Sequence, residues 1–299
     1  MSKYDEIFNG GRRQREAVSI PPFDKGLWIQ HKKAERERAF SLIDEAAERM
    51  AADGDRLKIY LDLQSRFPRF SVGNILLLSI QKPNATRIAE SKSWNEAGVY
   101  IKRGETGILL LGPGEAYQRE DGRSGVYFHA RRVFDVSQTT AEAGPAQTVN
   151  RDKRMLFRAL VSNAPCEIVS EDRKDIPDQM IARYVPEKRA VYVAKGLDSP
   201  LLFSEIAREL AHMHMDVGGC SREENEFAAA CVSYIICRRS NVDVSSFTFR
   251  DLPPEFQALD AKGVREELGK IRSAAINIET DIDRFYENLP ESVNRDDAR

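Results

Sequence analysis

Residues 205–216 read EIARELAHMHMD, and they carry the pattern that decides the fold of the second half of the chain. The Ser-Pro pair at 199–200 favours the start of a helix, because a capping serine and a proline in the first turn both suit a helix N-terminus. The Gly-Gly pair at 218–219 favours its end. The sequence therefore predicts one helix from Pro200 to about Met215.

The spacing within this helix is close to that of the HExxH zinc motif. In HExxH, two histidines at i and i+4 bind one zinc ion, and the glutamate between them acts as a general base on the zinc-bound water. Glu209 and His212 occupy the positions of the glutamate and the second histidine, and Arg208 occupies that of the first. A guanidinium stays charged and cannot bind zinc. Glu209 is thus the candidate catalytic base and His212 a candidate metal ligand.

A third ligand would come from the next predicted helix, Arg222 to Arg239, which begins with several acidic residues. We choose Glu226, because it leads directly into the apolar face of that helix. The same acids could simply favour a helix N-terminus. Three interpretations stay open: a zincin-like helix pair without functional zinc, a weak or altered zinc site, and no relation to a metal site. His212 and Asp216 form a second pair with i, i+4 spacing, but Met213 then occupies the position of the base.

The overall composition is that of a globular protein, and its charge is unevenly spread. The chain has 299 residues and a formal net charge of −2. Residues 1–140 carry +4 and the remainder −6, with +6 concentrated in residues 56–103. This asymmetry suggests two domains with different partners, although two ordinary solvated surfaces would give the same count. No apolar run is long enough to span a membrane, and no signal peptide is evident, which predicts a cytoplasmic protein.

The cysteine and histidine inventories limit the possible metal and redox chemistry. The four cysteines form no CxxC pair, which argues against a cysteine zinc site or a thioredoxin-type pair. Apolar neighbours around Cys231 and Cys237 indicate buried thiols in a reducing compartment. With four histidines in the chain, any metal site must use mostly carboxylates or the pair His212 and His214.

Helical and strand patterns predict an α+β fold with two domains. In the first half, helices are expected over 32–50, where Phe40, Ile43, Ala47 and Met50 share a face, and over about 57–66 and 71–81, followed by strands at 106–111 and 126–136. In the second half, a helix at 151–163 and strands at 166–169 and 190–194 precede the two helices above. The predicted division is 1–30 lead-in, 31–137 first domain, 138–150 linker, 151–250 second domain and 251–299 helical tail.

The first domain contains cationic, amide and aromatic residues in alternation. Single-stranded nucleic acid is held by cations on phosphates and by aromatic faces under bases, and this mixture supplies both. Phe70 and Trp94 could equally be core residues. The candidate DNA-binding residues are Arg66, Arg69, Phe70, Asn74, Gln81, Arg87, Lys92, Trp94, Tyr100, Lys102 and Arg103.

Residues 40–140 also contain an ordered set of short matches to a known family. The set reads FSxxNxxLLxxQxP over 70–83, KxGExGI over 102–108 and VFDVSQT over 133–139, with Trp94, Gly98 and Pro113 between them. It resembles the N-terminal domain of ArdC-type antirestriction proteins, which bind single-stranded DNA and travel on conjugative plasmids and transposons. In the second half, ARELAH at 207–212 and EFxAxxVSY at 226–234 resemble the zincin-type metallopeptidase domain of this family and of LtrC-like and IrrE-like proteins.

The resemblance implies a single-stranded-DNA-binding protein of a mobile element, with an antirestriction or conjugation-associated role and a zincin-like second domain. Arg208 departs from HExxH, which favours a degenerate, inactive peptidase domain. One alternative is an active zinc metallopeptidase acting on a peptide substrate, with Glu209 as base and zinc held by His212 and Glu226. Another is a scaffold that binds a protein partner through the C-terminal helix.

Overall fold

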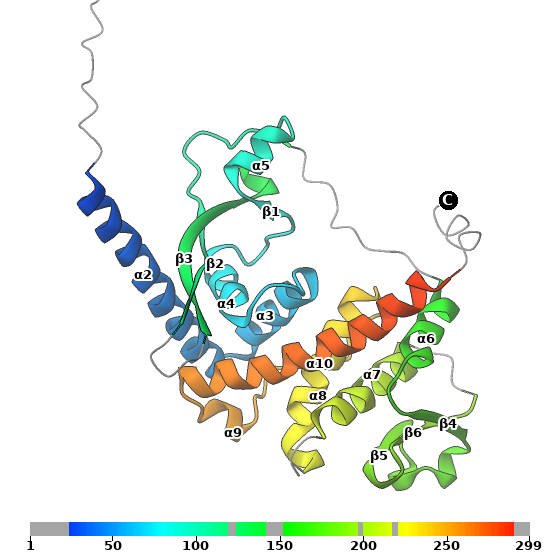
Figure 1. Ribbon diagram of the computed structural model, residues 1–299. Helices are drawn as coiled ribbons and strands as arrows, with labels where there is room; N and C mark the ends of the chain where they lie inside the picture. The colour runs from blue at the N-terminus through cyan, green and yellow to red at the C-terminus, as the bar shows by residue number, and fades with distance from the viewer. Residues whose placement is uncertain (1–23, 119–123, 142–151, 197–199, 217–220, 290–299) are drawn as a thin grey trace, which may run out of the picture.

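A computed structural model describes residues 24–118, 124–141, 152–196, 200–216 and 221–289. This part of the chain has an α+β fold of helices and two small sheets, which confirms the predicted class (Figure 1). The helices are α2 (Lys25–Ala51), α3 (Gly54–Arg66), α4 (Val72–Gln81), α5 (Ser91–Glu96), α6 (Lys153–Ser162), α7 (Pro200–Met215), α8 (Arg222–Arg239), α9 (Pro254–Gln257) and α10 (Ala261–Glu287). The strands are β1 (Ile88–Ala89), β2 (Ile108–Gln118), β3 (Ser124–Asp135), β4 (Glu167–Glu171), β5 (Ala182–Val185) and β6 (Ala190–Ala194).

Helices α2, α3 and α4 begin at residues whose side chains cap them. The carboxylates of Asp24 and Asp53 accept hydrogen bonds from the first turns of α2 and α3. The predicted cap Ser71 accepts one from the backbone of Asn74 in α4. Each cap satisfies an amide group that the helix itself leaves without a partner.

The first half of α2 differs from the prediction. The helix begins at Lys25, inside the expected lead-in, and residues 24–34 are exposed. Phe40, which the helical period placed on the apolar face, is exposed, whereas Ile43, Ala47 and Met50 are buried. Only the C-terminal half of α2 packs into the core, and its buried face begins at Ala39 instead of Phe40, one residue away from the position that the sequence pattern indicates.

The first sheet has the order β1-β3-β2 and is antiparallel in the described residues. Ile108 pairs with Val133, and Ile88 pairs with Asp135, which fixes the register of the three strands. Helix α4 packs on β2, and α2 contacts β3. Helices α2 and α4 thus pack against this sheet. The loop that contains α5 lies near the end of the sheet where β1 pairs with β3 (Figure 1).

The second sheet has the order β4-β6-β5, with β4 parallel and β5 antiparallel to β6. The sequence analysis found β4 and β6 but missed β5, since its four residues are too few to show a period. Helix α7 packs against β5 and β6, and α8 lies alongside α7. A capping box between Ser221 and Glu224 starts α8. This arrangement places one face of α7 between β5 and α8.

Helix α10 crosses the molecule and contacts helices of both halves (Figure 1). It packs against α2 and α4 of the first half and against α6, α7 and α8 of the second half. Apolar residues recur along it every three or four positions, which is the spacing of one helix face. These buried residues are Val264, Leu268, Ile271, Ala274, Ala275, Ile278 and Ile282.

The two halves also meet directly. A Cβ atom on Gly54, at the start of α3, would lie 1.6 Å from the carbonyl oxygen of Phe249, so only glycine permits this approach. The Asp62 carboxylate accepts hydrogen bonds from the Tyr234 hydroxyl and from Arg238, both at 2.8 Å. The buried apolar residues form one cluster that includes both halves. The predicted domain boundaries stay a prediction, and most of the predicted linker lies outside the described residues.

None of the described helices is both long enough and apolar enough to cross a lipid bilayer. Cys231 and Cys237 are buried free thiols. Burial raises the pKa of the Cys237 thiol to about 12 and of the half-buried Cys166 thiol to about 11, so both groups stay protonated near neutral pH.

Candidate functional site

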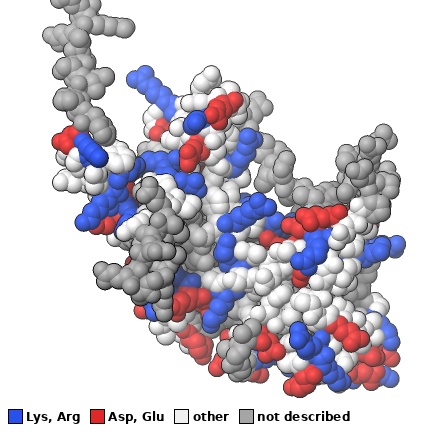
Figure 2. All heavy atoms as spheres, viewed as in Figure 1, with Lys and Arg blue, Asp and Glu red and all other residues white. Residues whose placement is uncertain are grey.

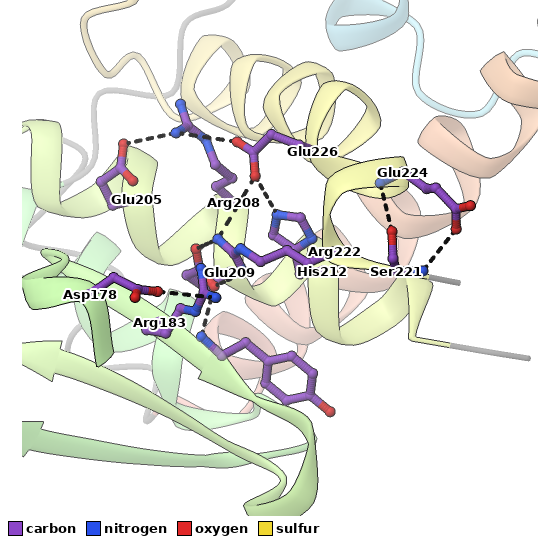
Figure 3. A network of polar contacts seen from close by, with 11 residues as sticks. Asp178, Arg183, Glu205, Arg208, Glu209, His212, Ser221, Arg222, Glu224 and Glu226 are labelled. Carbon is purple, nitrogen blue, oxygen red and sulfur yellow. Dashed lines mark hydrogen bonds and ion pairs between the residues drawn. The ribbon is translucent and has the colours of Figure 1, made fainter. Parts of the chain in front are cut away.

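One face of α7 and the start of α8 bring together six charged or titratable side chains, shown in Figure 3. Residues three and four apart on a helix share a face, which places those of α7 in one row and those of α8 opposite them. We call this group the ion-pair network. It consists of Glu205, Arg208, Glu209 and His212 from α7 and Arg222 and Glu226 from α8.

Arg208 lies between two carboxylates. Its Nη1 atom is 3.5 Å from Glu205 Oε1 and 3.7 Å from Glu226 Oε1. Its Nε atom is buried without a hydrogen-bond partner among the described residues. The residue that stands at the first HExxH position therefore directs a positive charge at Glu226, the residue that we chose as the third ligand.

The structure brings His212 and Glu226 together, but the two side chains hydrogen-bond to each other. His212 Nε2 lies 3.0 Å from Glu226 Oε2, and the imidazole is buried. The hydrogen bond from His212 lowers the pKa of Glu226 below its ordinary value, against the opposing effect of partial burial. The nearby charges of His212, Arg208 and Arg222 act in the same direction. Glu226 is thus held as a carboxylate.

Glu209, the candidate general base, is completely buried and fully hydrogen-bonded. Its two oxygens accept a bidentate pair from Arg222, at 2.5 and 2.8 Å. Oε2 also accepts a hydrogen bond from the backbone N–H of Tyr184 in β5, at 2.7 Å. The carboxylate is therefore buried and directed at protein donors, an environment unlike that of a general base, which must reach a water molecule to take its proton.

Burial and neighbouring charge act differently on the other two partners. Burial raises the pKa of Glu205, with the negative charges of Glu209 and Glu226 adding to it and Arg208 and Arg222 opposing it. For Arg222, burial opposes the charged form, but the hydrogen bond and charge of Glu209 outweigh it and raise its pKa. Arg222 therefore stays cationic beside its buried partner.

A divalent metal ion does not fit this arrangement. Two guanidinium groups already lie beside the carboxylates that would coordinate it, and like charges oppose each other strongly in a partly buried site. Within the described ranges, no group of three or more His, Cys, Asp or Glu side chains is placed to hold a metal ion. The site therefore offers no coordination shell for the zinc that the HExxH comparison suggested.

The alternative ligands do not form a second site. Asp216 accepts a hydrogen bond from the Tyr184 hydroxyl at 3.3 Å. Glu224 is used by the capping box at the start of α8. His214 is half-buried, and burial lowers the pKa of its imidazole, which favours the neutral form. None of these three side chains thus takes part in the ion pairs of the network.

Two of the six residues of the network, Glu205 and Arg222, had no role predicted from the sequence, and neither did the backbone of Tyr184. The i, i+4 spacing of Arg222 and Glu226 on an acidic helix start could have indicated an ion pair. Arg222 and Glu209 lie on two different helices. Their contact could therefore not be predicted from helical spacing and became visible only in the folded structure.

Several of the candidate DNA-binding residues lie along one segment next to the end of β3. Arg66 donates a hydrogen bond to the carbonyl of Ala85 at 2.7 Å, which places α3 beside this segment. The Arg87 guanidinium lies 4.9 Å from the centre of the Trp94 ring. Lys102 donates from Nζ to the carbonyl of Ser137 at 3.0 Å. We call the exposed residues of this segment, together with the partly buried Arg66 at its border, the basic strip: Arg66, Arg87, Lys92, Tyr100, Lys102 and Arg103.

Three other candidates are structural in this fold. The Asn74 side chain accepts from the N–H and donates to the carbonyl of Leu111 in β2, at 2.9 and 2.8 Å. Gln81 makes the same pair of bonds with Leu109. Trp94 is buried, and its indole N–H donates to the carbonyl of Phe134. These side chains thus hold α4 and α5 on the sheet through hydrogen bonds to strand backbone.

The remaining two candidates lie at the start of α4. Phe70 packs against the core and stacks on Phe67, with ring centroids 5.4 Å apart. Arg69 is exposed, while its carbonyl and that of Phe70 accept hydrogen bonds from Arg272 of α10. Phe70 therefore has the core role that the sequence analysis kept open.

The visible surface carries charged side chains of both signs. Figure 2 shows several Lys and Arg side chains over the upper and middle parts of the visible face, with some Asp and Glu among them. Over the lower part, around the β4–β6 sheet, Lys and Arg alternate with Asp and Glu.

The fold, unlike the sequence, is similar to known proteins. No family model and no curated protein matches the sequence. Two crystal structures of the antirestriction protein ArdC from plasmid R388 match the fold. The metal-free one gives a TM-score of 0.52 at 14% identity and covers 83% of this chain and 97% of that chain. The Mn(II)-bound one gives 0.51 at 16% identity, covering 81% and 98%. The chain therefore has the fold of the antirestriction protein ArdC.

Proposed function

We propose that the protein binds single-stranded DNA and acts as an antirestriction protein of a mobile genetic element such as a plasmid. The observation that carries the proposal is the basic strip on a fold that aligns with nearly the whole length of ArdC. The likeness extends over both halves, so it includes the half that carries the strip.

The chemistry of the strip favours a nucleic acid. Arg66 and Lys102 bind neutral carbonyl groups, and Arg87 lies over a neutral indole ring. These partners position the cations without cancelling their charge, so they can attract phosphate groups. The side chain of Tyr100 is 62% exposed between Lys92 and Lys102 in the sequence, where its ring can stack under a base.

The second half is proposed to be a zincin-like unit without peptidase activity. Glu209 is bonded to Arg222 and Tyr184, and Arg208 stands in the place of a histidine ligand. An active zinc peptidase needs a metal-bound water and a base that is free to take its proton. The ion-pair network supplies neither.

The test is a titration of a fluorescent single-stranded oligonucleotide with the full chain, followed by anisotropy at two salt concentrations. We expect binding that weakens as salt rises, because cations that bind phosphates release counterions. In a Lys102→Ala, Arg103→Ala double variant, the slope of log K against log salt should fall by about 0.7 for each phosphate group that the variant no longer neutralises.

A control variant distinguishes the loss of a positive charge in the strip from the loss of a positive charge elsewhere on the protein. Lys262→Ala removes an exposed lysine on α10, away from the strip, and should leave affinity unchanged. Absence of binding by the wild-type chain at low salt would contradict the proposal. Equal effects of the strip and control substitutions would show that only overall charge matters.

A further inference from the structure

We infer that two guanidinium groups take the structural role of a divalent cation in the α7–α8 site, so that the site is closed and stable without metal. The inference deepens the proposal of a metallopeptidase-like second half and does not depend on DNA binding. It also names one residue, Arg208, as the group that excludes metal.

The positive charge of the site lies where a metal ligand would stand. Arg208 lies one helical turn before His212, at the position of the first HExxH ligand. One oxygen of Glu226 lies 3.0 Å from His212 Nε2, and the other lies 3.7 Å from Arg208 Nη1. The three residues at ligand positions therefore converge as a metal site requires, but the positive charge among them belongs to a side chain.

The network combines three acidic side chains with two basic ones. Glu205, Glu209 and Glu226 bring the carboxyl groups, and Arg208 and Arg222 bring two fixed positive charges. Two guanidinium groups carry the same charge as one divalent ion. Burial of Glu209 is tolerated because Arg222 binds both of its oxygens, whereas an unpaired buried carboxylate would be very costly.

The network also joins three separate elements of the fold. Arg208 and His212 connect α7 to Glu226 of α8, and Arg222 of α8 reaches back to Glu209 of α7. Glu209 in turn accepts from the backbone of β5. A metal ion in a structural site joins separate elements through its ligands in the same way. In this chain, ion pairs and hydrogen bonds make those connections.

The experiment measures metal content and thermal stability of the full chain with MnCl2, ZnCl2 or EDTA. For the wild-type chain we expect no metal retained after dialysis and no change in the unfolding midpoint with either salt or with EDTA. One equivalent of retained metal, removed by EDTA together with a fall in the midpoint, would overturn the inference.

The decisive variant is Arg208→His, which places an imidazole at i, i+4 from His212 and removes one positive charge. We expect it to bind Zn²⁺ or Mn²⁺ and to be stabilised by it, since an ion at about 100 times its Kd raises the folding equilibrium constant about 100-fold. The double variant Arg208→His, His212→Ala should lose this gain. A folded Arg208→His chain that binds no metal would overturn the inference.

Arg208→Lys keeps the charge but cannot form the same fork of hydrogen bonds, and it tests the exclusion even where Arg208→His fails to fold. We expect this variant to bind no metal, whereas metal binding by it would overturn the role given to the charge. The oligonucleotide titration on the same samples is a separate readout. Absence of oligonucleotide binding by the wild-type chain, together with the expected metal results, would contradict the proposed function and leave this inference standing.

Discussion

In the first half of the molecule, Arg66 binds a backbone carbonyl and Arg87 lies over an indole ring, whereas in the second half Arg208 and Arg222 bind carboxylates. A neutral partner fixes the direction of a guanidinium and leaves its field intact. A carboxylate partner cancels that field. The same residue type thus keeps its charge available in one half, where we propose a binding surface, and makes an internal connection in the other, according to the charge of its partner.

The largest expected effect comes from breaking the buried pair. Arg222→Met leaves the Glu209 carboxylate buried with one backbone donor, and it should lower the free energy of unfolding by about 3–5 kcal/mol. Urea unfolding followed by circular dichroism measures the change. Adding Glu209→Leu to this variant should recover part of the loss, because the unpaired charge is then gone. A single variant as stable as the wild type would show that the pair is not formed.

A smaller loss of stability is expected from Asn74→Ala in the first half. The substitution leaves the N–H and the carbonyl of Leu111 without their partners, and we expect a total loss of about 1–3 kcal/mol, the range for an uncharged buried group left unpaired. The oligonucleotide affinity of the folded variant should not change, since Asn74 fastens α4 to β2. A variant of normal stability with weakened DNA binding would restore Asn74 to the candidate DNA-binding residues.

Tyr100→Ala tests the exposed aromatic residue of the basic strip. Loss of a base that stacks on the ring should weaken oligonucleotide binding by about 1–3 kcal/mol, measured by anisotropy. Tyr100→Phe keeps the ring and should bind as the wild type does. Equal weakening in both variants would assign the effect to the hydroxyl group instead of stacking.

The last expected effect is a difference in pH dependence at Glu279 of α10. Burial raises the pKa of this carboxyl to about 7, against the opposing charge of Arg239. Because its pKa in the folded chain lies above the ordinary value of 4.5, the folded state binds more protons between these values, and stability falls as pH rises through that range.

Glu279→Gln cannot ionise and should not show this fall. Urea unfolding of both proteins at pH 5 and pH 8 gives the comparison, and the stability of the variant relative to wild type should increase with pH. A relative stability that is constant between these two pH values would contradict the raised pKa.

The regular elements were largely predictable because each depends on local signals. Ser71 caps α4 as expected, and α7 and α8 lie where helix-start residues and apolar periodicity indicate. Errors occurred where tertiary contacts decide. Phe40 fits the helical period but is exposed, whereas Ala39 beside it is buried, and β5 is formed by pairing with β6 rather than by its own pattern.

The candidate sites could be predicted only in part. The sequence places His212 and Glu226 on consecutive helices, and they come within hydrogen-bond distance. That Asn74 and Gln81 would face strand backbones, and Trp94 the carbonyl of Phe134, depends on how α4 and α5 pack on the sheet. A side-chain amide beside a cation in the sequence fits a DNA contact as well as it fits a buried hydrogen bond to strand backbone. Which of the two it makes is decided by residues distant in the sequence.

Helix α10 follows every other described helix in the chain, yet α2, α4, α6, α7 and α8 all pack against it. During synthesis on a ribosome, those apolar faces therefore emerge well before the residues that cover them. We expect nascent chains that stop before residue 261 to expose these faces and to depend on chaperones or be degraded. Because of this order of the elements along the chain, the core of the whole molecule can be completed only after the last long helix has been synthesised.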